Sequence, residues 1–203
     1  MILHGTKSDL TGTPRREILR YMGYRKGAPE EPSARIDAEW QAQLNAAEPA
    51  AVYKVFPLER REEGLMIGGC LFASRVLEKN LKGCNRAYLM AATLGWAVDT
   101  RIRRAAYSDA LTPLIAQAVG AAMAEEWCNR VNETIRREAA PDLCRPRFSP
   151  GFGDLDLSNQ KHFEQLLGME RAIGIRLTET MLMLPSKSVT ALIGVAESPQ
   201  KDE

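Results

Sequence analysis

The middle of the chain contains a run of small and apolar residues, Ile115-Ala116-Gln117-Ala118-Val119-Gly120-Ala121-Ala122-Met123-Ala124. Small side chains allow a helix to lie very close to a neighbouring sheet. Ser108 precedes the run as a candidate cap, and Pro113 falls in the first turn, where its missing N–H does little harm. The pattern therefore predicts a long helix over residues 109–138 that acts as the central packing element.

Two helices are expected before this one, in an N-terminal part that covers residues 1–48. Thr13 as N-cap and Pro14 at the first helical position begin the first helix, and Gly23 ends it. The second helix begins at a capping Ser33. Its apolar residues recur every four positions on one face, at Ile36, Trp40 and Leu44.

The rest of the chain mixes strands with helices and has no regular alternation of the two. Strands are expected over 51–56, 65–72 and 87–94, and helices over 74–81, 96–106 and, from a capping Ser158, 158–167. Residues 175–183 and 188–195 read as paired strands joined by a turn at 185–187. This order favours an α+β fold, a twisted antiparallel sheet packed with long helices, in one domain over residues 1–203.

Composition excludes several classes of protein. The 27 Lys and Arg residues nearly balance the 26 Asp and Glu residues, which argues against a dedicated nucleic-acid binder. Neither a signal peptide nor a membrane-spanning stretch is visible, so a cytoplasmic protein is expected. The four cysteines are irregularly spaced, and the two histidines have no partner at metal spacing, so no metal site is predicted. No GxSxG, P-loop or GxGxxG motif is present.

A tight loop in the last third holds the strongest functional signal: Arg147-Phe148-Ser149-Pro150-Gly151-Phe152-Gly153. The forked guanidinium of Arg147 suits a carboxylate or phosphate. Pro150 and the two glycines favour a sharp turn. The two phenylalanines could flank a flat ring. The alternative is an ordinary Pro-Gly turn whose arginine pairs with a neighbouring acid such as Asp154.

The loop, with Asp154 after it, resembles the RxxPGY(G/P) motif of the activation domain of vitamin B12-dependent methionine synthase. Residues 173–189, which contain Leu177-Thr178-Glu179-Thr180 and Pro185-Ser186-Lys187-Ser188-Val189, resemble the second block of that family. Looser similarity to short stand-alone members covers Arg20 to Tyr24 and Ala92 to Gly95. The likeness is close only over residues 147–195.

The resemblance implies a reactivation component that presents S-adenosylmethionine for reductive remethylation of cob(II)alamin. Cobalamin would be reached only through a partner, a cobalamin-binding methionine synthase or another corrinoid protein, and a flavodoxin-type protein would supply the electron. By position, Arg147, Ser149 and Gly151 would bind S-adenosylmethionine, and Phe152 would face the corrinoid. No residue of the chain is assigned a catalytic role of its own.

The chain departs from the family pattern at three points. Phe152 replaces a tyrosine, Ala121 stands where a ligand-contacting glutamate is expected, with Glu125 one turn later as a substitute, and no terminal tyrosine follows the second block. Glu179 and Lys187 are expected to be solvated charges of a hairpin. These departures leave open a second interpretation, an adaptor that binds a corrinoid protein or corrinoid methyltransferase and has no small ligand of its own.

Overall fold

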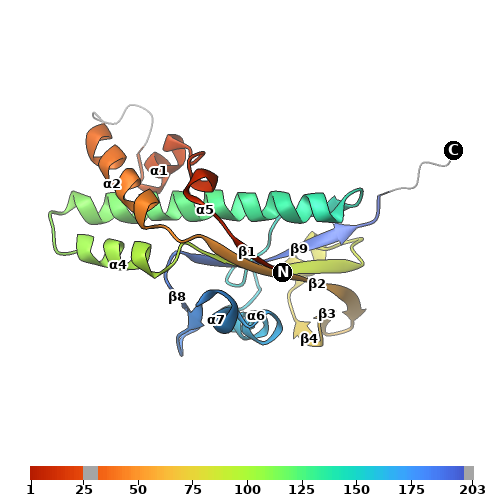
Figure 1. Ribbon diagram of the computed structural model, residues 1–203. Coiled ribbons are helices and arrows are strands. Elements are labelled where there is room, and N and C mark those ends of the chain that lie inside the picture. Colours follow the sequence, from red (N-terminus) through yellow and green to blue (C-terminus); the bar gives the residue numbers. More distant parts are fainter. Residues whose placement is uncertain (25–31, 199–203) are drawn as a thin grey trace.

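A central antiparallel sheet separates two layers of helices (Figure 1). The computed structural model describes residues 1–24 and 32–198. The long helix α5 runs along one face of the sheet, and α1 and α2 lie on the outer side of α5. Helices α6 and α7 cover the opposite face. The α+β architecture expected from the sequence, an antiparallel sheet packed with long helices, is confirmed.

The strands pair in the order β4-β3-β2-β5-β9-β6, and β1 pairs with the first half of β2. The described strands are β1 Ile2–His4, β2 Ala50–Arg61, β3 Gly64–Ile67, β4 Cys70–Phe72, β5 Arg86–Thr93, β6 Leu143–Cys144, β7 Arg176–Leu177, β8 Met183–Leu184 and β9 Ser188–Ala196. The described α-helices are α1 Arg15–Tyr21, α2 Ser33–Ala46, α3 Arg75–Asn80, α4 Trp96–Ala105, α5 Leu111–Ala139, α6 Gln160–Leu167 and α7 Met169–Ile173. Short 3₁₀ helices cover Lys7–Leu10 and Leu157–Asn159.

Helix α5 is the central packing helix that the small-residue run predicts. Its 29 residues give a length of about 44 Å at ~1.5 Å per residue. Ala118, Gly120 and Ala122 are all buried. A Cβ on Gly120 would lie 2.8 Å from Ile102 Cδ1 of α4, closer than real Cβ contacts. The absence of a side chain at this position therefore lets α4 and α5 pack directly against each other.

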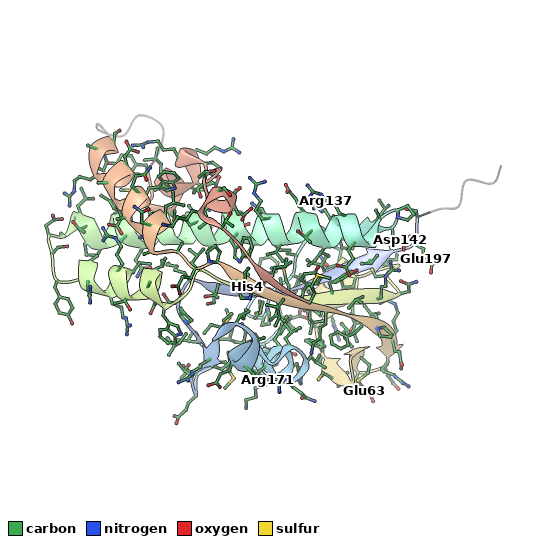
Figure 2. All side chains as sticks on the ribbon, viewed as in Figure 1. His4, Glu63, Arg137, Asp142, Arg171 and Glu197 are labelled. Atoms are coloured by element: carbon green, nitrogen blue, oxygen red, sulfur yellow. The ribbon has the colours of Figure 1, made fainter. Side chains whose placement is uncertain are left out.

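Apolar side chains fill both faces of the sheet. One buried cluster joins α5, α2 and α4 to one face and includes Met123, Val131 and Ile193. A second cluster lies on the other face, between the sheet and α3, α6 and α7, and includes Phe163 and Leu192. Figure 2 shows that side chains occupy the space between the sheet and the helices. The sheet is therefore buried on both sides, as a three-layer arrangement requires.

The expected hairpin of residues 175–183 with 188–195 is wrong. Strand β9 pairs with β5 from Ser188 to Val195 and with β6 at its end, whereas within the described residues β7 pairs with β8 alone. Almost every residue of β9 is buried, which is typical of a strand inside a sheet and not of a solvated hairpin arm. A turn closed by Thr178 N–H to Leu182 O, 2.9 Å, interrupts the preceding segment. The sequence pattern did not indicate whether the strand over residues 188–195 would pair with the neighbouring segment or with β5.

Two other strand expectations also change. The single strand expected over 65–72 is a hairpin of β3 and β4, because Gly68 and Gly69 both have positive φ, +59° and +81°, and form its turn. The N-terminal part, expected to be helical, also contributes β1 to the sheet edge.

The four expected helix caps are all wrong. Helix α2 has Pro32 at its N-cap position, and Ser33 is its first residue. The hydroxyls of Thr13 and Ser108 donate to carbonyl oxygens three residues earlier, at 2.7 and 2.6 Å. At α5 the capping group is Asp109, whose carboxylate accepts the N–H groups of residues 111 and 112 at 2.9 and 3.0 Å. Before α6 it is Asp156, which accepts the N–H of Ser158 at 2.8 Å. An ionised carboxylate is the stronger acceptor for these N–H groups.

Within residues 1–24 and 32–198, none of the helices combines the length and apolar character needed to cross a membrane. The same part of the chain has no cluster of three or more His, Cys, Asp or Glu side chains arranged to hold a metal ion.

We expect Ala118→Leu to destabilise the protein, because Ala118 is 2 % exposed within the buried core cluster and three more carbons would have to enter that packed space. Overpacking of this kind costs about 1–3 kcal/mol, which for a chain of this size lowers the unfolding midpoint by roughly 2–4 °C per kcal/mol. Thermal unfolding followed by circular dichroism measures the shift.

The matched control is Arg137→Leu, on the outer side of the same helix with 83 % of its side chain exposed (Figure 2). It should leave the midpoint nearly unchanged. Equal effects of the two substitutions would contradict the close packing of α5.

Candidate functional site

The loop after β6 is built from two consecutive turns. The N–H of Phe152 donates to Ser149 O at 3.2 Å, with Pro150 and Gly151 at the central positions and a φ of +87° at Gly151. This is the pattern of a type II turn. The N–H of Leu155 then donates to Phe152 O at 3.2 Å, with Gly153 at φ +60°. Proline and glycine therefore set the loop conformation locally, as the sequence indicated.

Asp154 fastens the loop to the start of α3. Its carboxylate accepts the Ser74 hydroxyl and the backbone N–H groups of Arg75 and Val76, the latter two at 2.9 and 3.2 Å. These hydrogen bonds, the Ser74 bond first, hold the pKa of Asp154 below its ordinary value. Asp154 is thus engaged with α3, and it is not the partner of Arg147.

Arg147 points towards α5. The following residue, Phe148, pairs with Leu192 of β9 through two hydrogen bonds of 2.9 and 2.7 Å and is buried on the other face of the sheet. Successive side chains of an extended chain point to opposite sides. Strand pairing at Phe148 therefore directs the guanidinium of Arg147 to the helix.

The two terminal nitrogens of Arg147 differ in their environment. Nη2 pairs with the carboxylate of Glu125 and donates to the Asn129 side-chain oxygen at 3.1 Å. Nη1 is buried and has no hydrogen-bond acceptor among the residues that the structure describes. The side chain as a whole is 17 % exposed. One half of the guanidinium fork is held by α5, and the other half is an unused donor.

The other residues expected to contact a ligand or the corrinoid are Ser149, Gly151 and Phe152, and all three lie in the loop. Ser149 and Gly151 lie in the first turn of the loop, directly after the Arg147–Phe148 pair. Phe152 is 64 % exposed and packs edge-to-face on Phe148, with ring centroids 5.3 Å apart. The idea that the two phenylalanines flank a flat ring is therefore wrong, because Phe148 is buried in the core and only Phe152 is open to a partner.

On α5, the spacing of four residues places Ala121, Glu125 and Asn129 on one face. Glu125 is the acid that contacts Arg147, and the small Ala121 lies one turn before it. The sequence analysis did not predict that Asn129 contacts Arg147. Its only signal was its position one turn after Glu125.

Lys187 is also placed differently from the expectation of a solvated hairpin charge. Its ammonium donates to Gln117 of α5 at 2.8 Å. The side chain is partly buried, which lowers the pKa of Lys187, while the nearby carboxylate of Asp99 opposes that shift. Glu179 is exposed, in agreement with a turn charge.

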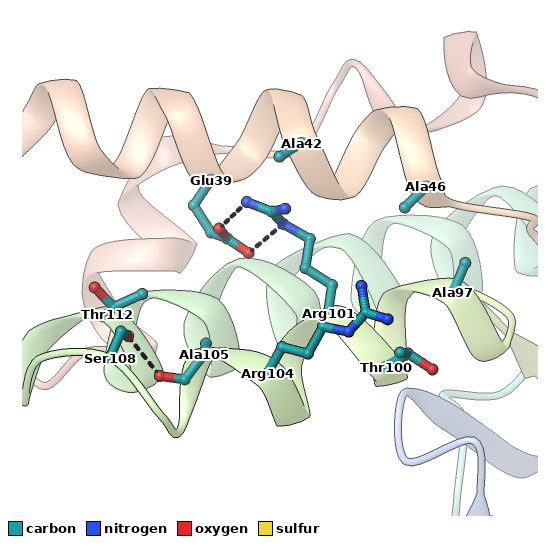
Figure 3. A pocket seen from close by; sticks show the side chains of 10 residues that line it. All are labelled: Glu39, Ala42, Ala46, Ala97, Thr100, Arg101, Arg104, Ala105, Ser108 and Thr112. Carbon is teal, nitrogen blue, oxygen red and sulfur yellow. Dashed lines mark hydrogen bonds and ion pairs between the residues drawn. The ribbon is translucent and has the colours of Figure 1, made fainter.

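A separate cavity of about 550 Å³ lies between α2 and α4. Figure 3 shows Arg101 of α4 reaching Glu39 of α2 across it, with hydrogen bonds of 3.0 and 2.7 Å. Most of the other lining residues are small, and none of them belongs to the loop or to its contacts on α5. In this cavity Arg101 is already paired with Glu39, whereas Arg147 keeps a buried donor without an acceptor among the described residues, so Arg147 is the stronger candidate for a ligand contact.

The chain can now be compared with known proteins. The family model described as vitamin B12 dependent methionine synthase, activation domain, matches residues 76–201, more than half of the chain. The fold is similar to that in a crystal structure of the MetH reactivation domain bound to AdoHcy, with a TM-score of 0.71 and 16 % sequence identity. The similarity covers 98 % of this chain and 78 % of that one. This chain belongs to the family of activation domains of vitamin B12-dependent methionine synthases.

Proposed function

We propose that this chain is a stand-alone reactivation component, which presents S-adenosylmethionine to a cobalamin carried by a separate methionine synthase or corrinoid protein. Membership of the activation-domain family supports the reactivation role. The bound AdoHcy in the structurally similar MetH domain supports a ligand of the S-adenosyl class. Ser149 and Gly151 are proposed as further contacts, through the backbone of the first turn.

The observation that carries this proposal is the buried, unpartnered Nη1 of Arg147. A buried donor without an acceptor costs about 1–3 kcal/mol, and a ligand carboxylate would remove that cost. Glu125 and Asn129 hold Nη2, so they fix the direction in which Nη1 points. Glu125 is itself 43 % exposed, which leaves its carboxylate accessible to the ammonium of the same amino-acid ligand.

The residues also fit contact with a corrinoid held by a partner. Phe152 offers an exposed apolar ring, supported from behind by Phe148, and such a ring packs well against a flat macrocycle. A cobalamin held by the partner would supply the cobalt that accepts the methyl group of S-adenosylmethionine, which would consume one electron and leave S-adenosylhomocysteine. The proposed source of the electron is a flavodoxin-type partner. The chain contributes position: it binds the methyl donor and orients it.

A ligand-free adaptor is the second candidate. Glu125 already neutralises much of the charge of Arg147, and Ala121 supplies no polar group one turn away. Both features weaken a carboxylate site. The adaptor would bind a corrinoid protein through Phe152 and its surroundings, without S-adenosylmethionine.

Isothermal titration with S-adenosylhomocysteine separates the two candidates. If Nη1 binds the ligand carboxylate, Arg147→Ala should weaken binding about 10- to 100-fold, the equivalent of a charge-assisted hydrogen bond of roughly 1.5–3 kcal/mol. Arg145→Ala is the matched control, since that arginine lies two residues away and donates to Lys82 O at 2.9 Å. Absence of binding to the unsubstituted chain at millimolar ligand, with retained binding to a corrinoid protein, would select the adaptor.

The attachment of the loop to α3 should depend on the charge of Asp154. Because its pKa in the folded protein lies below the ordinary 3.8, the attachment contributes fully above that value and is lost as the pH falls through the folded pKa. The amide NMR signals of Arg75 and Val76 should therefore titrate with a midpoint below 3.8. In Asp154→Asn this titration should vanish. A midpoint at or above 3.8 would show that the carboxylate is not hydrogen-bonded as described.

A further inference from the structure

Gln117 extends the face of α5 that carries Ala121, Glu125 and Asn129 by one more turn. These four residues follow at intervals of four, so they form one stripe along the helix, and none of them is fully buried. Two cations from other parts of the chain contact this stripe, one at each half. Arg147 contacts Glu125 and Asn129, and Lys187 contacts Gln117. Ala121 lies between the two contacts.

The chain holds Lys187 in place at its end of the stripe. The buried carboxylate of Asp99 accepts both the backbone N–H and the hydroxyl of Ser186, the N–H at 2.9 Å, so the residue before Lys187 is fixed. A Cβ on Gly120 would lie 3.0 Å from Lys187 Cε. The aliphatic stem therefore lies directly over the helix backbone at Gly120. Among the described residues Gln117 is the hydrogen-bond acceptor for the ammonium, which has three donors.

The separation along α5 of the residues that the two cations contact suits an extended ligand. Gln117 and Glu125 are eight residues apart, which corresponds to about 12 Å along the helix axis. An amino acid joined to a nucleoside has its carboxylate at one end and a purine ring at the other, separated by an aliphatic and ribose linker. The methyl side chain of Ala121 occupies little of the space between the ends.

We propose that Lys187 and Gln117 form a second subsite, which binds the nucleoside end of the ligand whose carboxylate is bound by Arg147. The Lys187 ammonium and the Gln117 amide donate hydrogen bonds to ribose oxygens and purine ring nitrogens there. This inference rests on the proposed function, since it assigns the other end of the same ligand. It gives Lys187, in the segment between β8 and β9, a role in ligand specificity.

Two ligands separate the two ends of the site in a titration experiment. S-adenosylhomocysteine has both ends, whereas 5′-methylthioadenosine has the nucleoside and no carboxylate. Lys187→Met keeps the stem and removes the donors, so it should weaken S-adenosylhomocysteine binding about tenfold, the loss expected for one charge-assisted hydrogen bond. Any affinity for 5′-methylthioadenosine should fall by the same factor in Lys187→Met and stay unchanged in Arg147→Ala.

Gln117→Leu tests the same subsite and does not depend on whether Lys187→Met folds. Gln117 is exposed on the helix surface, so its substitution should leave the fold intact. It should also weaken S-adenosylhomocysteine binding. Lys161→Met is the matched control, an exposed lysine on α6 on the opposite face of the sheet, and it should have no effect.

The results distinguish this inference from the proposed function. If Arg147→Ala weakens S-adenosylhomocysteine binding while Lys187→Met and Gln117→Leu leave it unchanged, the second subsite is overturned and the proposed function stands. If the unsubstituted chain does not bind S-adenosylhomocysteine, both are overturned. If all three substitutions weaken binding and Lys161→Met does not, the inference is supported.

Discussion

Helix α5 can lie directly on the sheet and on α4 because its inner face carries alanines and a glycine in place of large side chains. Gly120 shows the constraint most clearly, since even a single added carbon there would overlap Ile102 and crowd Lys187. The same close approach lets two residues next to β9 reach the helix: Arg147 contacts Glu125, and Lys187 contacts Gln117. Packing and site are therefore consequences of one feature, the small volume of this helix face.

The site is assembled from segments that are distant in the sequence. Strand pairing at Phe148 turns Arg147 towards α5, where its guanidinium donates hydrogen bonds to Glu125 and Asn129. Asp154 fastens the loop to α3 on the other side of the sheet. Phe152 is left exposed at the tip. A rigid loop with one buried cation and one exposed aromatic ring is suited to hold a small anionic ligand next to a partner surface, and this is the role that the proposed function gives it.

Features with local causes could be predicted from the sequence. The small-residue run gave the long helix, and Pro150 with Gly151 and Gly153 gave the tight loop. Contacts between distant segments were not predictable in the same way. The partner of β9 is β5, and nothing within residues 175–195 distinguishes that pairing from a local hairpin. Lys187 has the composition of a turn residue, and only the tertiary fold places it against Gln117. The caps were missed because serine, threonine and aspartate compete for the same N–H groups, and aspartate binds them here at α5 and before α6.

The central claim is that the unused, buried donor of Arg147 binds a ligand carboxylate next to α5. A crystal structure of the chain with S-adenosylhomocysteine tests it most directly. The account predicts the ligand carboxylate within hydrogen-bonding distance of Arg147 Nη1 and the nucleoside extended along α5 towards Gln117. A ligand seated in the cavity between α2 and α4, or bound without contact to Arg147, would contradict it.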